Sequence, residues 1–562
     1  MTQTRSLWEH GVKTGIIGGV AVLVIALVGM VESFHRRDII AEVITMGQVL
    51  LLIGGVFIGY IAAKRTGSDE SLAPGLNAVI GSSVTGGFLA FLVIVGRLIN
   101  LRAVLVNASP MLYKLLTLGH KGVAGIFIIL LIGMGCGVFA AALFYLPRLT
   151  RRVIILSLSS MIIAGVLQDL IRPVIAAWGP VAVVSEWLFT GNGLTVSGSI
   201  SIVILIAVVM TAWALKGQDI KSGYGNLSGG SQRGIKISAF FMLAVVLLAL
   251  PHILGLFLSE VLTIVGLYVL LGLGLNIVVG YAGMLDLGYV AFFAIGSYVT
   301  AVLTSPELGF FSLTFWQALP FAVVLGIFFG VLLGIPVLKM RGDYLAIATL
   351  GFGEIIRILV LSDFLRPWLG GAQGAGKIPK AAIMGYQFIT PQQIYYLILA
   401  GCILVVFISL RLKGSRLGRA WMAMREDEDV AQAMGINLVA TKLLAFATGA
   451  GFSALSGAIF ASKLGSVYPH SFNVIISINI LCLIIVGGMG SIPGVIVGAA
   501  ALVGLPELLR EFAEYRLLVY GAALVAMMIL RPEGLWPEVR HKMELHAEEE
   551  NNIGEPEPST AT

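Results

Sequence analysis

Long apolar runs alternate with short polar stretches along most of this chain of 562 residues. The run at 122–147 carries no charged side chain and exceeds the ~20 residues that an α-helix needs to cross the hydrocarbon core of a bilayer. A transmembrane β-barrel would instead show alternating strands of ~10 residues, a pattern that this sequence lacks. The pattern therefore predicts an all-α polytopic membrane protein with about 16 transmembrane helices.

The predicted spans form two groups. The first group is expected at 14–31, 43–63, 76–96, 122–147, 153–176 and 198–215. The second group is expected at 237–257, 260–280, 287–304, 317–338, 343–361, 394–410, 440–463, 474–489, 491–507 and 517–530. The segment 101–120 is less apolar than these runs, and we expect it to lie at the membrane interface.

Between the two groups lies KGQDIKSGYGNLSGGSQRGIK at 216–236, whose Gly, Ser and charged residues are typical of a linker. We therefore divide the chain into an N-terminal membrane extension of about six helices at 1–215, this linker, and a membrane domain of about ten helices at 237–537. The remaining residues, 538–562, are acidic and lack apolar periodicity, so we expect a disordered tail.

Charge is sparse and is concentrated at the ends of the spans. Charged residues make up 12% of the chain, hydrophobic residues 58%, and the net charge is +6. Basic residues beside membrane spans anchor them on the cytoplasmic side, which explains this charge without any nucleic-acid partner. The span count then places both termini in the cytoplasm, although Arg36, Arg37 and the segment 97–121 are basic on the opposite side. The apolar run after Lys13 is interpreted as a true span rather than a signal peptide.

The sequence contains no convincing catalytic, cofactor or metal site. The stretch GAQGAGK at 371–377 matches part of a phosphate-binding loop, but Ile378 stands where Ser or Thr should hold Mg²⁺. The seven histidines are scattered, and Cys136, Cys402 and Cys482 lie in apolar runs, which indicates buried free thiols. We expect neither enzymatic activity nor ATP hydrolysis in this chain.

A few polar residues are predicted within the membrane, where charge is costly and is often functional. Glu354 and Arg357 are three residues apart on one predicted helix face, which we expect to point into the bundle. They could line a solute path or lock helices together. Asp286 lies in a Gly-rich break between two spans and could mark a substrate path, a buried anchor or a cytoplasmic turn, and Asn276 could cap that break.

The charged stretch Arg411–Asn437 stands out between two apolar runs. Leu417, Ala420, Trp421, Met424, Val430 and Met434 recur in it at helical spacing, which predicts an apolar stripe. We expect an amphipathic docking helix from Arg416 to Gly435, in which the acids precede a new helical turn that Gly435 stops, rather than a charged loop that merely follows the positive-inside rule. The residues expected to act in it are Arg416, Arg419, Arg425, Glu426, Asp427, Ala431 and Gly435.

Several motifs carry a family resemblance. They are GLGLNIVVGYAGMLDLGYVAFFAIGSYVTAVL, MRGDYLAIATLGFGEIIRI, GRAWMAMREDEDVAQAMGIN, KLLAFATGAGFSALSGAIF and RPEGLWP. The region at about 237–540 resembles permease subunits of branched-chain amino acid ABC importers, specifically the M-type subunit. The resemblance implies a bacterial inner-membrane complex with a second homologous permease, two ATP-binding cassette subunits and an extracytoplasmic binding protein. It also implies that the turn Ala431–Gly435 couples to the ATPase.

The expected function is therefore ATP-driven import of branched-chain or related hydrophobic amino acids. Two alternatives stay open at this point. The same family also serves urea and short amides, so fold resemblance does not fix the solute. An ion-coupled secondary transporter would instead use Asp286 and Glu354 as proton or Na⁺ sites.

Overall fold

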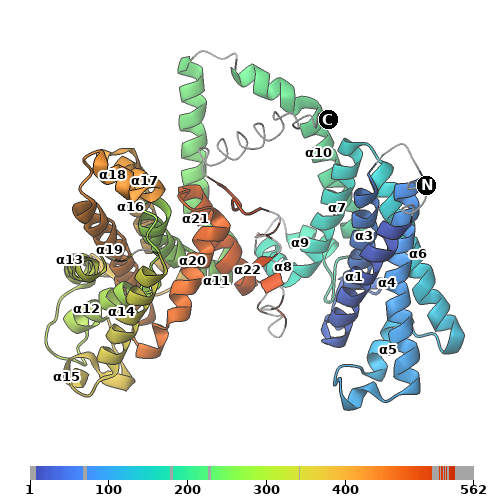
Figure 1. Cartoon of the computed structure of the whole chain (residues 1–562), viewed down its shortest axis with the longest axis horizontal. Coiled ribbons are helices and arrows are strands. Elements are labelled where there is room, and N and C mark those ends of the chain that lie inside the picture. The colour runs from blue at the N-terminus through green and yellow to red at the C-terminus, as the bar shows by residue number, and fades with distance from the viewer. Residues whose placement is uncertain are drawn as a thin grey trace, which may run out of the picture. The chain divides into compact units, whose positions relative to one another are not determined.

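The computed structural model confirms the all-α class and divides the chain into two compact units, 1–241 and 242–562 (Figure 1). The structure describes residues 8–67, 72–177, 182–225, 229–508 apart from 339 and 341, scattered positions at 510–529, and 531–537. The expected tail at 538–562 and half of the expected span at 517–530 lie outside these residues. The two units are described separately below.

Four long helices form the core of the first unit: α1 (Glu9–Leu27), α3 (Met46–Thr66), α4 (Ala73–Leu98) and α6 (Gly122–Tyr145). Small residues let the backbones approach, as membrane helices require in the absence of a hydrophobic drive between them. A Cβ at Gly133 would lie 3.0 Å from the carbonyl oxygen of Ser82. The Ser82 hydroxyl donates to the Gly55 carbonyl at 2.8 Å, which ties α4 to α3.

Two further long helices, α7 (Arg148–Val166) and α10 (Val196–Gly225), belong to this unit. Its shorter elements are α2 (Met30–Phe34), β1 (Asp38–Ile40), β2 (Ile44–Thr45), η1 (Leu101–Ala103), α5 (Pro110–Leu116), α8 (Gln168–Ala176) and α9 (Ala182–Leu188). The segment 101–120 thus holds only short helices among its described residues. The expected span at 153–176 was wrong as a continuous helix, because the helical backbone is interrupted at Leu167 and restarts as α8. The expected linker is helical on both sides of 226–228.

The second unit begins within α11 (Gly229–Leu275), which breaks at Gly255, where φ is +76°. It continues as α12 (Val290–Thr304), α13 (Phe315–Val337), α14 (Asp343–Leu361), α15 (Arg366–Leu369), α16 (Pro391–Gly414), α17 (Arg416–Glu426), α18 (Glu428–Ala433), α19 (Leu438–Leu464), α20 (Val474–Gly487), α21 (Ile492–Ala499) and α22 (Leu505–Leu508). Single turns and π segments lie at η3 (Asn276–Tyr281), η4 (Gly371–Gln373), η5 (Pro469–Ser471) and η6 (Ala500–Gly504), and β3 (Ala382–Ile383) pairs with β4 (Tyr386–Gln387).

The number of membrane spans depends on whether a helix that is broken inside, as α11 is at Gly255, is counted as one span or as two. The described residues contain 12 helices that are long and apolar enough to cross a membrane, and two shorter apolar ones, Val290–Thr304 and Ile492–Leu508. The stretch Gly230–Tyr281 counts as one of the 12, although the break at Gly255 separates the two spans expected there. The count of sixteen therefore stays a prediction.

Helix α19 lies at the centre of the second unit, against α12 and α13. Glycines on α13 make this packing possible: a Cβ at Gly330 would lie 2.8 Å from the carbonyl oxygen of Phe446. The Tyr289 hydroxyl donates to the carbonyl of Gly449 at 2.9 Å, which fixes the start of α12 to the middle of α19. Figure 1 shows α17 and α18 at one end of this unit and α15 at the opposite end.

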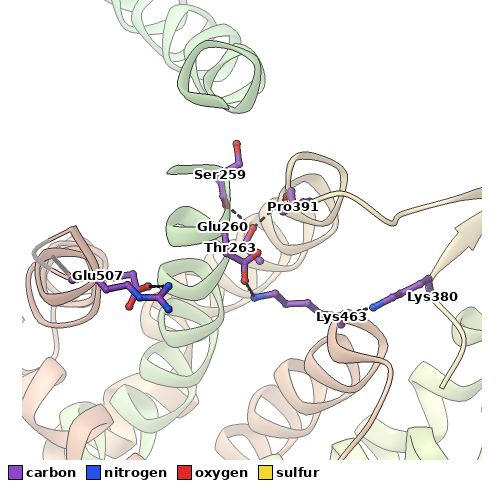
Figure 2. A network of polar contacts seen from close by, with 8 residues as sticks. Ser259, Glu260, Thr263, Lys380, Pro391, Lys463 and Glu507 are labelled. Carbon is purple, nitrogen blue, oxygen red and sulfur yellow. Dashed lines mark hydrogen bonds and ion pairs between the residues drawn. The ribbon is translucent and has the colours of Figure 1, made fainter. Parts of the chain in front are cut away.

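An ion-pair network joins three elements at the end of the second unit away from α17 (Figure 2). The Lys463 ammonium, at the end of α19, lies 2.6 Å from Oε1 of Glu260 on α11. Lys380, in the loop before α16, donates to the carbonyl of Lys463. Burial, and then the charge of Lys463, lower the pKa of Lys380. The network anchors this loop to two helices of the bundle.

We expect Glu260→Gln to lower the free energy of unfolding by about 1 kcal/mol, because it leaves the nearly buried Lys463 ammonium without its counter-charge. The cost stays small because the Glu260 side chain is 40% exposed and solvent screens the pair. Thermal unfolding of the purified protein measures the change. Glu307→Gln, at an exposed acid, is the matched control. Equal melting temperatures for the two variants would contradict the prediction.

Candidate functional site

The charged stretch between α16 and α19 folds as two short helices and not as the single helix expected from Arg416 to Gly435. The Ser415 hydroxyl accepts a hydrogen bond from the Gly418 amide at 3.2 Å and caps α17. Asp427 has extended backbone angles, and its carboxylate accepts from the amides of Asp429 and Val430 at 2.8 and 3.0 Å. Asp427 therefore ends α17 and caps α18, because an Asp at this position satisfies the free amides of a new helix.

The α18 turn ends at Gly435, where φ is +87° and no atom lies within 4 Å of a Cβ added there. Glycine adopts this left-handed conformation without strain and commonly terminates helices in this way. The Ile436 amide then donates to the carbonyl of Ala431 at 3.1 Å, which closes the turn. The Ala431 side chain is buried and Gly435 is exposed.

The inner face of α17 is built on Trp421. This side chain is fully buried, and its indole N–H donates to the Thr441 carbonyl on α19 at 2.8 Å. Met424 is buried beside it, so this half of the expected apolar stripe is confirmed. The other half was wrong: Val430 is 58% exposed and Met434 is 79% exposed, because the break at Asp427 turns α18 outward.

Arg425 connects α17 to the first helix break of the membrane bundle. Its Nη1 donates to the carbonyl of Gly280 at 2.6 Å. Gly280 lies in η3, where the helical chain ends before a turn that leads to α12. At Gly283, φ is +71°, and a Cβ there would lie 2.9 Å from Cγ of Arg425. The turn can therefore pass directly against Arg425 only because Gly283 lacks a side chain.

Lys413 connects the end of α16 to a second break, at 488–491 between α20 and α21. Its Nζ donates to the carbonyl of Gly490 at 3.3 Å and lies 5.6 Å from the centre of the Tyr281 ring. A cation over a tyrosine face is attracted by the ring quadrupole. The amide of Gly490 in turn donates to Oδ1 of Asn276 at 2.9 Å. Asn276 thus ties the second break to the first, beyond the local capping role expected for it.

A buried ion pair fixes α18 to α19. Lys442 Nζ lies 2.8 Å from Oε1 of Glu428, and the Lys442 side chain is only 6% exposed. Lys442 lies near the start of the apolar helix α19, so its charge would be expensive without this partner. The α17–α18 segment therefore contacts the bundle at Trp421, Arg425 and Glu428, and it is positioned as a rigid attachment.

The other predicted residues of this segment face away from the bundle. Arg416, Arg419 and Glu426 are exposed, and Arg419 donates to the Gly414 carbonyl at 3.1 Å. Together with Val430 and Met434 they form an outer face that carries both charge and apolar surface. We call the five residues Arg416, Arg419, Glu426, Val430 and Met434 the outer face of α17–α18.

Asp286 lies in the turn between η3 and α12 and is fully buried. Its Oδ1 accepts a hydrogen bond from the Gly288 amide at 2.9 Å. The neighbouring Leu287 amide donates to the Thr349 hydroxyl on α14 at 3.0 Å. This geometry suits an anchor for the turn that precedes α12.

Glu354 and Arg357 form an ion pair on α14, with carboxylate-to-guanidinium distances of 2.7 and 2.8 Å. The expectation that they point into the bundle stays a prediction: the Glu354 and Arg357 side chains are 33% and 35% exposed, and Arg357 also lines a small cavity with Tyr298 and Phe472. Ile355 and Ile358 are exposed beside them. The pair therefore lies at the margin between the buried and the exposed side of a predicted membrane span.

Lys413, Glu428 and Lys442 were not predicted as members of this site. One signal was present, since Lys442 is a charge within an apolar run and such charges are usually paired. The partner of Lys442 could be guessed among the nearby acids, but the acceptors of Lys413 and Arg425 are backbone carbonyls far along the chain. Nothing in the pattern of side chains indicates such acceptors.

Comparison with known proteins agrees with this architecture. Residues 257–528 match the family model described as branched-chain amino acid transport system / permease component. The chain is 40% identical over 335 residues to the high-affinity branched-chain amino acid transport system permease protein LivM of Salmonella typhimurium, covering 55% of this chain and 77% of the relative. Identity to LivM of Escherichia coli K12 is 36% over 400 residues, covering 64% and 93%.

A more distant likeness links the chain to LivH, a second permease protein. Identity to LivH of Salmonella typhimurium is 25% over 294 residues, covering 48% of this chain and 92% of LivH. No solved structure matches the chain. Because relatives that are 36–40% identical are covered over more than two thirds of their length, the chain belongs to the family of branched-chain amino acid transport permeases.

Proposed function

We propose that this chain is one of two permeases in an ATP-driven importer of branched-chain or related hydrophobic amino acids. The partners would be a second homologous permease, two ATP-binding cassette subunits and an extracytoplasmic substrate-binding protein. The observation that carries the proposal is the attachment of α17–α18 to both helix breaks, through Arg425 at Gly280 and Lys413 at Gly490. A chain that receives mechanical work from another subunit needs such a connection.

The ATPase subunits would press on the outer face of α17–α18. Arg416, Arg419 and Glu426 supply charge for orientation, while Val430 and Met434 supply apolar contact area. Gly435 keeps the end of α18 tight and free of a side chain at that surface. Mixed surfaces of this kind, with apolar anchors inside a polar rim, are typical of protein interfaces.

Displacement of α17 would then move the two breaks together. Arg425 holds the carbonyl of Gly280, Lys413 holds that of Gly490, and Asn276 bonds the two breaks to each other. Irregular backbone inside a membrane bundle is tolerated where it lines a cavity or is buried in protein, and broken helices often border transport paths. The breaks would thereby open one side of the path while closing the other.

The partial exposure of the ion pair Glu354–Arg357 is a reason to propose that a partner protein covers this side of α14. A charged pair that is one third exposed is unfavourable against lipid tails near the middle of a bilayer. Contact with the second permease, or with a water-filled path between the two permeases, removes this cost. We place the surface for the second permease here.

The expected membrane orientation follows from the same contacts. The α17–α18 end would face the cytoplasm of a bacterial cell, where ATP is available, and the Lys463–Glu260 end would face outward. Both termini would then be cytoplasmic. The binding protein would deliver solute at the outward end.

Uptake of radiolabelled leucine in a host that lacks its own importer tests the proposal. We expect uptake when the chain is produced with the second permease, the two ATPases and the binding protein, and loss of uptake when any one is omitted. Excess unlabelled isoleucine should compete, whereas urea and acetamide should not. Competition by urea alone would favour the amide alternative, and uptake without the ATPases would favour ion-coupled transport.

We expect Met434→Asp to reduce co-purification of the ATPases by about tenfold, which corresponds to ~1.4 kcal/mol of binding free energy. Burying a carboxylate at the interface costs more than this. The tagged chain, isolated in mild detergent, gives the measurement by quantitative immunoblotting. Met340→Asp is the matched control, at an exposed methionine outside α17–α18. Equal recovery of the ATPases with both variants would remove Met434 from the interface.

A further inference from the structure

The first unit contains a cavity that the transport proposal does not use. It has a volume of about 360 Å³ and lies among α1, α3, α4 and α6, with α5 beside it. This volume falls within the range of ~300–1,000 Å³ that is typical of small-molecule sites. The family model matches only 257–528, so nothing in that match assigns a role to this unit.

The lining of the cavity is almost entirely hydrocarbon. Its walls include Val22, Leu52, Leu89, Leu116, Ile129 and Ile132. None of the described residues that line it is charged. A zwitterionic amino acid or an ion would therefore lose its hydration without gaining a counter-charge, and both are excluded as occupants.

The few polar groups at the wall already have partners within the protein. Ser82 donates to the Gly55 carbonyl at 2.8 Å, and Thr85 donates to the Gly81 carbonyl at 3.0 Å. Oε1 of Gln48 accepts from the Thr45 amide at 3.0 Å. A buried water needs two to four free polar partners, whereas an apolar cavity stays dry. The cavity therefore suits an apolar occupant better than water.

The lining residues follow about two turns of the helices. The most exposed of them are Val43 and Leu118, at 64% and 47%, so the mouth lies in the loops that carry them. On α6 the wall runs from Ile129 to Cys136, about 10 Å along the helix. An apolar cavity of this depth between membrane-spanning helices can hold part of a hydrocarbon chain.

We propose that this cavity binds one acyl chain of a membrane phospholipid, with the headgroup at the mouth. The bilayer around α1, α3, α4 and α6 supplies such chains at high local concentration, and every buried methylene group favours binding. His120 and Lys121 follow Leu118 directly and are exposed, so they offer donors to a phosphate at the mouth. The bound lipid completes the packing of the N-terminal helices.

Native mass spectrometry of the purified chain tests the proposal, with extensive detergent washing before the measurement. We expect wild type to keep a bound phospholipid and Ile132→Trp, which fills the cavity, to keep at least about tenfold less. The matched control is Leu131→Trp, one residue away and 66% exposed, which should keep as much lipid as wild type. Leu52→Phe narrows the same cavity from α3 and serves if Ile132→Trp does not fold.

A second measurement separates loss of lipid from loss of fold. Adding phosphatidylglycerol to the washed proteins should raise the melting temperature of wild type and Leu131→Trp but leave that of Ile132→Trp unchanged. Equal lipid retention by Ile132→Trp and wild type would overturn the proposal, and so would a wild type that keeps no lipid. Recovery of an isoprenoid quinone in place of phospholipid would overturn the assignment of the occupant. Lipid retention and the effect of added lipid on the melting temperature do not depend on whether the chain transports amino acids.

Discussion

Replacing Arg425 by methionine should separate ATP hydrolysis from solute uptake in the assembled transporter. The substitution removes the charge-assisted hydrogen bond to the Gly280 carbonyl, a contact of 2.6 Å, and keeps an unbranched apolar side chain in place of the arginine stem. Such bonds contribute about 1.5–3 kcal/mol, and 1.4 kcal/mol corresponds to tenfold in an equilibrium. We expect the ratio of solute transported to ATP hydrolysed to fall about tenfold or more.

Proteoliposomes that contain the whole complex give both rates in one experiment. Arg411→Met is the matched control, because Arg411 lies near the end of α16, is exposed, and is not part of the outer face of α17–α18. This control variant should retain the wild-type ratio of solute transported to ATP hydrolysed. Arg425→Lys should recover part of the ratio, since an ammonium can still donate to the carbonyl. An unchanged ratio in Arg425→Met would rule out Gly280 as a point of force transfer.

Replacing Trp421 by alanine should have the largest effect on stability. The indole is fully buried, and it satisfies the Thr441 carbonyl at the start of α19. Truncation of a buried tryptophan to alanine typically costs 3–5 kcal/mol, and the orphaned carbonyl adds to this. We therefore expect the melting temperature to fall by roughly 10 °C.

Two further variants assign this loss to its causes. Trp421→Phe keeps most of the buried surface and loses the indole donor, so it should cost only about 1 kcal/mol. Met434→Ala, at a position that is largely exposed, should leave the melting temperature close to that of wild type. Scanning fluorimetry in detergent measures all three. If the melting temperature of Trp421→Ala equals that of wild type, α17 is not packed on α19.

The apolar periodicity predicted the all-α class and the inner face of α17. Trp421 and Met424 are three residues apart, which places them on one face, and both are buried. The same spacing failed for Val430 and Met434 because Asp427 interrupts the helix. An Asp followed by further acids is a typical cap, and the new helical turn expected after the acids is present as α18.

The contacts that define the site could not be predicted in the same way. Arg425 and Gly280 are 145 residues apart, and Asn276 and Gly490 are 214 residues apart. Their acceptor and donor groups belong to the backbone, which is chemically alike at every position. Only the fold brings these groups together, whereas the glycines at 280, 283 and 490 indicated merely that the chain bends there. The partial exposure of Glu354 likewise depends on how α14 packs against other helices. The three-residue spacing between Glu354 and Arg357 does not reveal this packing.

We propose that this chain contains no source of energy of its own and receives work through α17–α18. Sealed liposomes that contain the purified chain and its partner permease, but no ATPase, test it directly. With an imposed proton or Na⁺ gradient and external radiolabelled leucine, we predict no accumulation above the level in empty liposomes. Accumulation that follows either ion gradient would contradict the account and would identify an ion-coupled transporter.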